Sequence, residues 1–230
     1  IHAVRLGADP IRLAWLQVAS SVVYVTMCIV VGRLSDRISK ALLLRLGCVA
    51  MAVSCYLIGR THSYVALLLL VPLAGLASSL FWPPVQGAIG SEAKPENLER
   101  AIGLFNILWS LGKGLGFISA GAIHGHLGTY WTLLVAAGGA ILALAIYPWR
   151  ERKGTKLDLD DPVDPEVRKK FLRMAWVANF TLFGVGAIIA NQYYKYLEGT
   201  GAGRSLVPAE TFFGLFLGLI YLAQTAVFAL

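Results

Sequence analysis

One charged residue, Lys113, stands inside a long apolar stretch that covers residues 101–123. Asn106, Trp109 and Lys113 are spaced i, i+3 and i+7, so in a helix they share one face. A charge at membrane depth is rare and usually functional. A lysine beside an aromatic ring and an amide favours contact with an anionic solute. The alternative is structural: Lys113 pairs with a carboxylate on another helix or extends toward the membrane interface.

Two further stretches carry polar or helix-bending residues. Residues 64–89 contain Trp82, Pro83, Pro84 and Gln86, with Trp82 and Gln86 one helical turn apart. Because proline removes a backbone donor and bends a helix, this segment either lines a solute cavity or forms a simple bend near its end. The third group of candidate cavity residues consists of amides in residues 171–195: Asn179, Asn191 and Gln192. Asn191 and Gln192 lie near the outer end of this stretch, where they form either an extracellular gate or part of an interfacial belt.

The sequence offers no constellation for catalysis. It contains no Ser/His/Asp pattern, phosphate-binding loop, Cys/His metal spacing or paired membrane carboxylates, so we expect no catalytic residue, cofactor or metal. Three cysteines lie in apolar stretches and are expected to act as small apolar fillers: Cys28, Cys48 and Cys55. The histidines are expected in solvated loops of the outer side: His2, His62, His124 and His126.

The elements that position these residues follow from composition. Of the 230 residues, 57% are hydrophobic and 14% are charged, whereas soluble domains are about 25% charged. A soluble domain could not bury so much apolar surface, and a nucleic-acid binder is equally disfavoured. Seven stretches reach the roughly 20 apolar residues that a spanning helix needs: 13–32, 41–59, 64–89, 101–123, 130–149, 171–195 and 211–230. The predicted class is an all-α integral membrane protein.

The distribution of basic residues predicts the orientation in the membrane. Fourteen of the 20 lysines and arginines lie in one set of loops or within five residues of it, five lie toward the other side, and Lys113 lies deep within a span. The positive-inside rule places the richer set in the cytoplasm, namely the loops 33–40, 90–100 and 150–170. The chain would then start outside and end near the cytoplasm after seven crossings of a cell membrane.

Glycines on several spans predict close helix packing. Two pairs on the stretch with Lys113 are four residues apart, Gly112 with Gly116 and Gly121 with Gly125. This spacing allows helix backbones to touch. Gly32, at the end of the first span, is expected to permit a similar close approach at the membrane edge.

The first cytoplasmic loop reads Gly-Arg-Leu-Ser-Asp-Arg-Ile-Ser-Lys over residues 32–40. It resembles the signature loop between helices 2 and 3 of the major facilitator superfamily. The resemblance implies a conformational-switch loop built on Gly32, Asp36, Arg37 and Lys40, in which the aspartate clamps the two halves in the outward-facing state. Ser39 and Ala41 depart from the family pattern, which commonly has a glycine and a second basic residue there.

The resemblance also implies an organisation for the whole chain. The seven spans become helices 2–8 of an expected twelve, so that helix 1 and helices 9–12 are missing from a truncated bundle. Residues 1–149 form the N-terminal half with helices 2–6. Residues 150–170 form the cytoplasmic linker between the halves, and 171–230 begin the C-terminal half with helices 7 and 8.

The function that these expectations favour is secondary active transport of a small solute by alternating access. The implied partners are a small-molecule substrate, with anions among the candidates, a coupling H⁺ or Na⁺, and the lipid bilayer, but no nucleic acid. The alternative is a seven-helix receptor or photoreceptor. It is disfavoured because the last span has no lysine for a retinal Schiff base and because the loop 32–40 has no role in it. A lipid scramblase or a structural membrane protein stays open.

Overall fold

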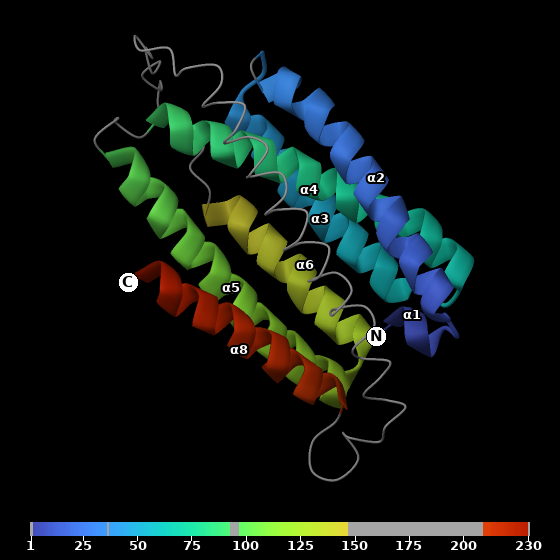
Figure 1. The fold of residues 1–230 in the computed structure, drawn as a ribbon. Helices are drawn as coiled ribbons and strands as arrows, with labels where there is room; N and C mark the ends of the chain where they lie inside the picture. The colour runs from blue at the N-terminus through green and yellow to red at the C-terminus, as the bar shows by residue number, and fades with distance from the viewer. Residues whose placement is uncertain (1, 36, 93–96, 147–208, 230) are drawn as a thin grey trace.

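The computed structural model describes residues 2–35, 37–92, 97–146 and 209–229. This part of the chain is helical and contains no strand. The helices, labelled in Figure 1, are α1 (His2–Arg5), α2 (Pro10–Ser35), α3 (Lys40–Arg60), α4 (Tyr64–Glu92), α5 (Leu98–Leu127), α6 (Thr129–Ile146) and α8 (Ala209–Ala229). The predicted all-α class is confirmed, and the predicted span 171–195 lies outside the described residues.

Five helices, α2 to α6, are long and apolar enough to cross a membrane. The apolar stretch of α8 covers residues 210–226 and is shorter than the five spanning helices. The outward faces of these helices carry large apolar side chains: Ile11 is 70% exposed and Leu69 is 74% exposed. A soluble monomer does not present such continuous apolar surface, so these faces fit contact with lipid.

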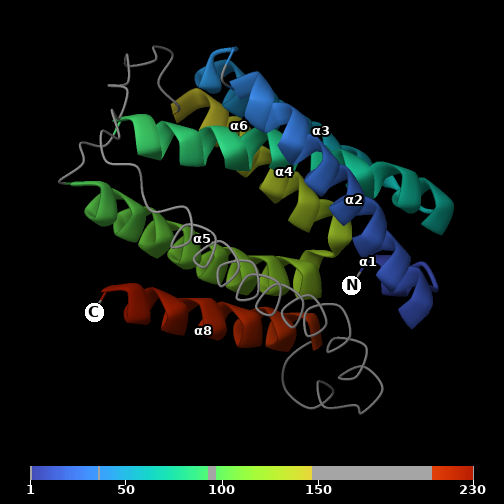
Figure 2. The same ribbon diagram turned by 45° about the horizontal axis from the view of Figure 1, so that its top comes forward.

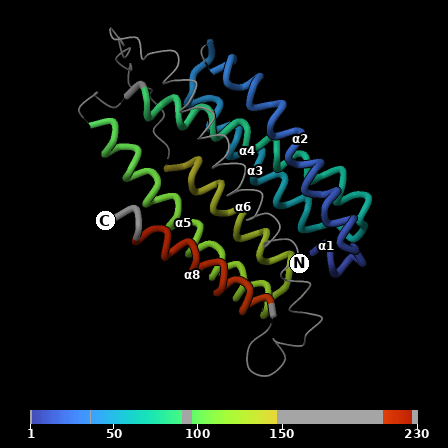
Figure 3. The backbone as a smooth tube through the Cα atoms, viewed as in Figure 1, coloured from blue at the N-terminus to red at the C-terminus, as the bar shows by residue number. Residues whose placement is uncertain are grey.

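The helices pack in two groups. In one group α2 packs on α4, α4 packs on α3, and α3 packs on α6, whereas α5 makes its main contact with α8. Figures 1 and 2 show α8 lying beside α5 over the length of α8, and the colours and the C label in Figure 3 show that the two helices run antiparallel. Contacts of α5 with α4 and α6 are fewer. The α5–α8 pair therefore forms a unit beside the four-helix group.

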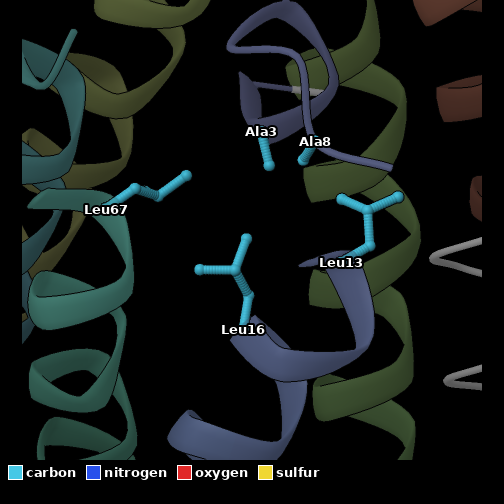
Figure 4. Close-up of a cluster of buried hydrophobic side chains, with 5 residues drawn as sticks. All are labelled: Ala3, Ala8, Leu13, Leu16 and Leu67. Carbon is cyan, nitrogen blue, oxygen red and sulfur yellow. The ribbon is translucent and has the colours of Figure 1, made fainter. Parts of the chain in front are cut away.

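The beginning of the chain is anchored by a small buried cluster. Ala3 and Ala8 pack with Leu13 and Leu16 of α2 and with Leu67 of α4, as Figure 4 shows. Tyr64, at the start of α4, donates its hydroxyl to the carbonyl oxygen of Arg12 at 3.0 Å. Because these residues come from three helices, the cluster fixes α1 against the ends of α2 and α4.

Two glycines allow α4 to pack closely against α2 on one side and against α3 on the other. A Cβ on Gly75 of α4 would collide with the carbonyl oxygen of Ser20 on α2. On the other side of α4, a Cβ on Gly47 of α3 would stand 3.3 Å from the carbonyl oxygen of Ala77. Glycine at these two positions lets neighbouring backbones approach as spanning helices commonly do.

Candidate functional site

Lys113 lies near the middle of the 30-residue helix α5 and is held between two aromatic rings. Its Nζ stands 4.2 Å from the ring centroid of Trp109 and 4.8 Å from that of Tyr221 on α8. The same Nζ lies 3.4 Å from the Tyr221 hydroxyl oxygen, a long donor contact. Cation–π attraction therefore contributes to placing the charge, and the lysine connects α5 to α8 at mid-helix.

The two rings belong to a larger aromatic cluster, which comprises Trp82, Phe105, Trp109, Phe117 and Tyr221. Trp82 of α4 meets Phe105 and Trp109 edge to face, with ring centroids 6.0 Å and 5.8 Å apart. On the opposite side, Tyr221 stacks on Phe117 with centroids 5.5 Å apart. The cluster thus joins α4, α5 and α8 around one cationic group.

Lys113 has no carboxylate partner within salt-bridge distance among the residues that the structure describes. Its contacts there are the Trp109 ring and the ring and hydroxyl of Tyr221. A partly buried ammonium group with only rings and a long hydroxyl contact keeps capacity for a negatively charged group. The arrangement can therefore bind an anion.

The structure brings together some of the predicted candidates. Trp82 and Trp109 meet beside Lys113, and Asn106 lies on the same face of α5, half-buried. Gln86 is exposed, and no hydrogen bond or ring contact joins it to the cluster within the described ranges. The helix α4 continues through Pro83 and Pro84 to Glu92. Three candidates lie outside the described residues, so their placement stays a prediction: Asn179, Asn191 and Gln192.

The glycines that pack α5 against α8 are not the predicted pairs. Among the described residues, a Cβ on Gly112 or on Gly116 would meet nothing within 4 Å, so the prediction that this pair packs against another helix is wrong for this part of the chain. The contacts instead involve Gly114 and Gly121, the latter correctly predicted to pack. They lie seven residues apart and therefore on one face of the helix.

The partner helix contributes its own glycines, four residues apart. A Cβ on Gly214 would stand 2.5 Å from the Phe117 carbonyl oxygen and 2.7 Å from Cα of Gly121. A Cβ on Gly218 would collide with the Ile118 side chain. We call these four residues, Gly114, Gly121, Gly214 and Gly218, the glycine seam. Their packing places α5 and α8 in direct backbone contact.

Hydroxyl groups fix the register of the seam. Thr225 of α8 donates to the Oγ of Ser110 at 2.9 Å, and Ser110 is fully buried. At the other end, Thr211 donates to the carbonyl oxygen of Gly121 at 3.2 Å. Polar contacts in an apolar environment favour one alignment of two spanning helices over others.

The loop 32–40 joins α2 to α3 and contacts α4. The backbone N–H of Arg37 and that of Ile38 both donate to the Leu34 carbonyl oxygen, which ends α2 in a tight turn. Ser39 caps α3 by accepting the Leu42 N–H at 3.3 Å. Lys40 donates its Nζ to the carbonyl oxygen of Gly87 at 3.0 Å, which ties the loop to the last part of α4.

The other predicted residues of this loop have different outcomes. Arg37 is exposed, and Asp36 lies outside the described residues. The close helix approach expected at Gly32 is wrong for the described part of the chain, where a Cβ at this position would meet nothing within 4 Å. Among the described residues, Gly32 therefore has open space beside it and no helix in close contact.

An ion pair closes the end of the molecule at which α5 ends and α8 begins, which the charge pattern predicts to be the outer end. Arg5 donates to Glu210 at 2.8 Å, with side chains 48% and 13% exposed.

The expectation of four solvated histidines is wrong at two positions. His124 of α5 is buried and its Nε2 has no partner among the described residues. The ring of His2 contacts the Thr61 carbonyl oxygen at 3.1 Å, and burial lowers its pKa.

Sequence reasoning missed the contributions of α8. Tyr221, Gly214, Gly218 and Glu210 lie on one apolar helix that shows no charged candidate at mid-span. A usable signal was present for the glycines, since Gly214 and Gly218 have the same four-residue spacing that was noted on α5. Tyr221 could only be recognised once the register of α8 against α5 was known.

Long apolar helices, lipid-compatible outer faces and a cation near mid-helix define a multi-pass integral membrane protein. The family model described as Major Facilitator Superfamily matches residues 2–230, and the chain belongs to this family. It is accordingly a membrane transporter, and the match gives no support to the receptor alternative. A comparison with curated proteins finds no match.

Proposed function

We propose that the protein is a secondary active transporter that moves a small solute by alternating access. The observation that carries this proposal is the placement of Lys113 between Trp109 of α5 and Tyr221 of α8. A solute bound at Lys113 touches α5 and α8, which the proposal assigns to different halves of the protein, so its binding energy can act on the orientation of the halves. A ligand shifts a conformational equilibrium only through such differential contacts.

The two helices belong to different halves in the organisation that we propose. Residues 1–149 form the N-terminal half, 150–170 the cytoplasmic linker, and 171–230 the first part of the C-terminal half. The glycine seam then lies at the interface between the halves. Direct backbone contact along α5 and α8 supports a rocking motion in which the two helices stay paired while the surrounding helices separate at one end or the other.

The orientation and the energy source belong to the same proposal. The loops 33–40, 90–100 and 150–170 face the cytoplasm of a cell membrane, because they hold most of the basic residues. The sequence contains no phosphate-binding loop, so an H⁺ or Na⁺ gradient drives transport. The loop 32–40 acts as the conformational switch, with Gly32, Asp36, Arg37 and Lys40 as its functional residues.

Distance measurements between spin labels test alternating access without knowledge of the solute. One pair of labels, at His62 and Phe212, reports on the predicted outer end, and a second pair, at Ile38 and Ala226, reports on the inner end. All four sites have exposed side chains. We expect two distance populations for each pair in lipid nanodiscs. A single, unchanging distance at both ends contradicts the proposal.

A cross-link provides the matched control. In a background without native cysteines, Arg5→Cys and Glu210→Cys are joined by a bifunctional methanethiosulfonate reagent, because the native side chains meet there. We expect the tether to remove the long-distance population at the outer end and to enrich it at the inner end. Each single-cysteine variant treated with the same reagent should keep both populations.

A further inference from the structure

The chemistry around Lys113 is more specific than a site for any anion. We infer that Lys113, Tyr221 and the surrounding rings bind a small carboxylate whose body is aromatic or apolar. The inference rests on the proposed function only in treating this site as the solute site. It goes further by naming the class of solute, and three features of the site carry it.

The first feature is the charge balance. Lys113 is half-buried, and its contacts among the described residues are two aromatic rings and one long hydroxyl contact. A cation–π contact places an ammonium group without neutralising it. A carboxylate oxygen accepts a shorter and stronger charge-assisted bond than a ring face provides. One formal positive charge matches one formal negative charge on the solute.

The second feature is the small number of donors. Sulfate or phosphate, stripped of water, needs many hydrogen-bond donors to replace its hydration. Within the described part of the chain, the cluster offers the Lys113 ammonium group and the Tyr221 hydroxyl, and the Asn106 amide lies two helical turns along the same face of α5. The hydroxyl of Tyr221 lies 3.4 Å from Nζ, so both groups can turn to the two oxygens of one carboxylate. The donor set fits a carboxylate better than an inorganic oxyanion.

The third feature is the aromatic environment of the charge. The rings of Trp82, Trp109 and Tyr221 form a continuous series of edge-to-face contacts, with neighbouring centroids 5.8 Å and 6.3 Å apart. Rings prefer such offset or edge-to-face arrangements with other rings. When the carboxylate accepts the bond from Nζ, the ammonium group leaves the ring faces. These faces then become available to an apolar or aromatic solute body.

The binding experiment uses the purified full-length protein in nanodiscs and four probes: benzoate, phenylacetate, 3-phenylpropionate and indole-3-acetate. Calorimetric titration measures the Kd of each probe. We expect saturable binding of at least one of them. Phenylacetamide, the neutral analogue of phenylacetate, and sulfate should bind at least tenfold more weakly. Failure of all four carboxylates to bind, or equal binding of phenylacetamide or sulfate, overturns the inference.

Variants assign the binding to this site. Lys113→Gln should weaken binding at least tenfold, whereas Lys113→Arg should retain most of it because the charge remains. Tyr221→Phe keeps the ring and removes the hydroxyl donor, so a loss of a few-fold is expected. Arg100→Gln, an exposed cation on the same helix, serves as the matched control and should leave the Kd unchanged. Equal Kd values for the wild type and Lys113→Gln overturn the inference.

The outcome is independent of the test of alternating access. Carboxylate binding that depends on Lys113, found together with a single spin-label distance, supports this inference and contradicts the transport mechanism. Two distance populations without carboxylate binding leave the mechanism in place and overturn the assignment of the solute class.

Discussion

Gly214 of α8 lies directly on Gly121 of α5, and a Cβ added at Gly214 would stand 2.7 Å from Cα of Gly121. No real Cβ tolerates such a contact, so any larger residue must push the helices apart. The pair is therefore the point at which the glycine seam is least able to adapt.

A valine at position 214 should destabilise the protein. Gly214→Val places a branched side chain against the backbone of α5, and overpacking of this kind costs about 1–3 kcal/mol. We expect a lower midpoint of thermal unfolding in nanodiscs. Gly116→Val is the control on the same pair of helices, because that position faces open space. Equal effects of the two substitutions would show that the seam is not a close contact.

The ion pair between Arg5 and Glu210 should respond asymmetrically to substitution. Arg5→Gln leaves the carboxylate of Glu210, which is only 13% exposed, without its cation, whereas Glu210→Gln leaves a half-exposed guanidinium that water can solvate. We expect Arg5→Gln to cost the larger amount, about 1 kcal/mol more than Glu210→Gln, because removing the cation beside a mostly buried carboxylate is costly.

The exposed pair of Asp9 and Arg12 supplies the control for this comparison. Its atoms lie 4.0 Å apart and both side chains are more than half exposed. Arg12→Gln should therefore change the thermal midpoint very little, as is usual for surface ion pairs. If Arg12→Gln and Arg5→Gln lower the thermal midpoint equally, the burial of Glu210 does not increase the contribution of its ion pair to stability.

Replacing His124 by phenylalanine should preserve or raise stability. The imidazole is buried, and its Nε2 finds no hydrogen-bond partner among the described residues. An unsatisfied buried donor or acceptor costs about 1–3 kcal/mol, which an apolar ring of similar shape avoids. His126→Phe, two residues along and exposed, should be neutral. A large loss of thermal stability in His124→Phe alone would indicate that the imidazole has an essential partner.

Lys40 should hold the loop 32–40 against α4. Lys40→Met removes the charged donor to the Gly87 carbonyl oxygen while it keeps the length of the side chain. Hydrogen bonds to charged groups contribute about 1.5–3 kcal/mol, so amide hydrogen exchange in the loop should accelerate. Lys40→Arg should retain slow exchange, because a guanidinium donates to the same acceptor. Unchanged exchange in Lys40→Met would show that this bond does not order the loop.

The helices were predictable from sequence because each span is a long apolar segment bounded by charged or turn residues. Predicted ends agree with the described helices within about four residues, the usual uncertainty of such boundaries. The sequence also predicts which residues share a helix face with Lys113, because Asn106, Trp109 and Lys113 follow helical periodicity. Membership of the major facilitator superfamily was indicated by the loop 32–40 and is confirmed by the family match.

Features that depend on contacts between helices were not predictable. Gly112 and Gly114 are two residues apart and equally small, yet only Gly114 faces α8. Residue spacing alone does not predict which face of a spanning helix contacts protein and which contacts lipid. For the same reason, the burial of His124 and the contact of Tyr221 with Lys113 could not be predicted, because both depend on the pairing of α5 with α8.

Accessibility of the Asn106 position tests the central claim most directly. Asn106→Cys, in a background without native cysteines, places a thiol on the Lys113 face of α5 and keeps the lysine. A membrane-impermeant methanethiosulfonate reagent is applied to one side of the membrane at a time. We predict labelling from each side, and a tether between positions 5 and 210 should suppress the reaction from the outer side alone. Labelling from neither side, or outer-side labelling that the tether leaves unchanged, would contradict a solute path that opens alternately along this face.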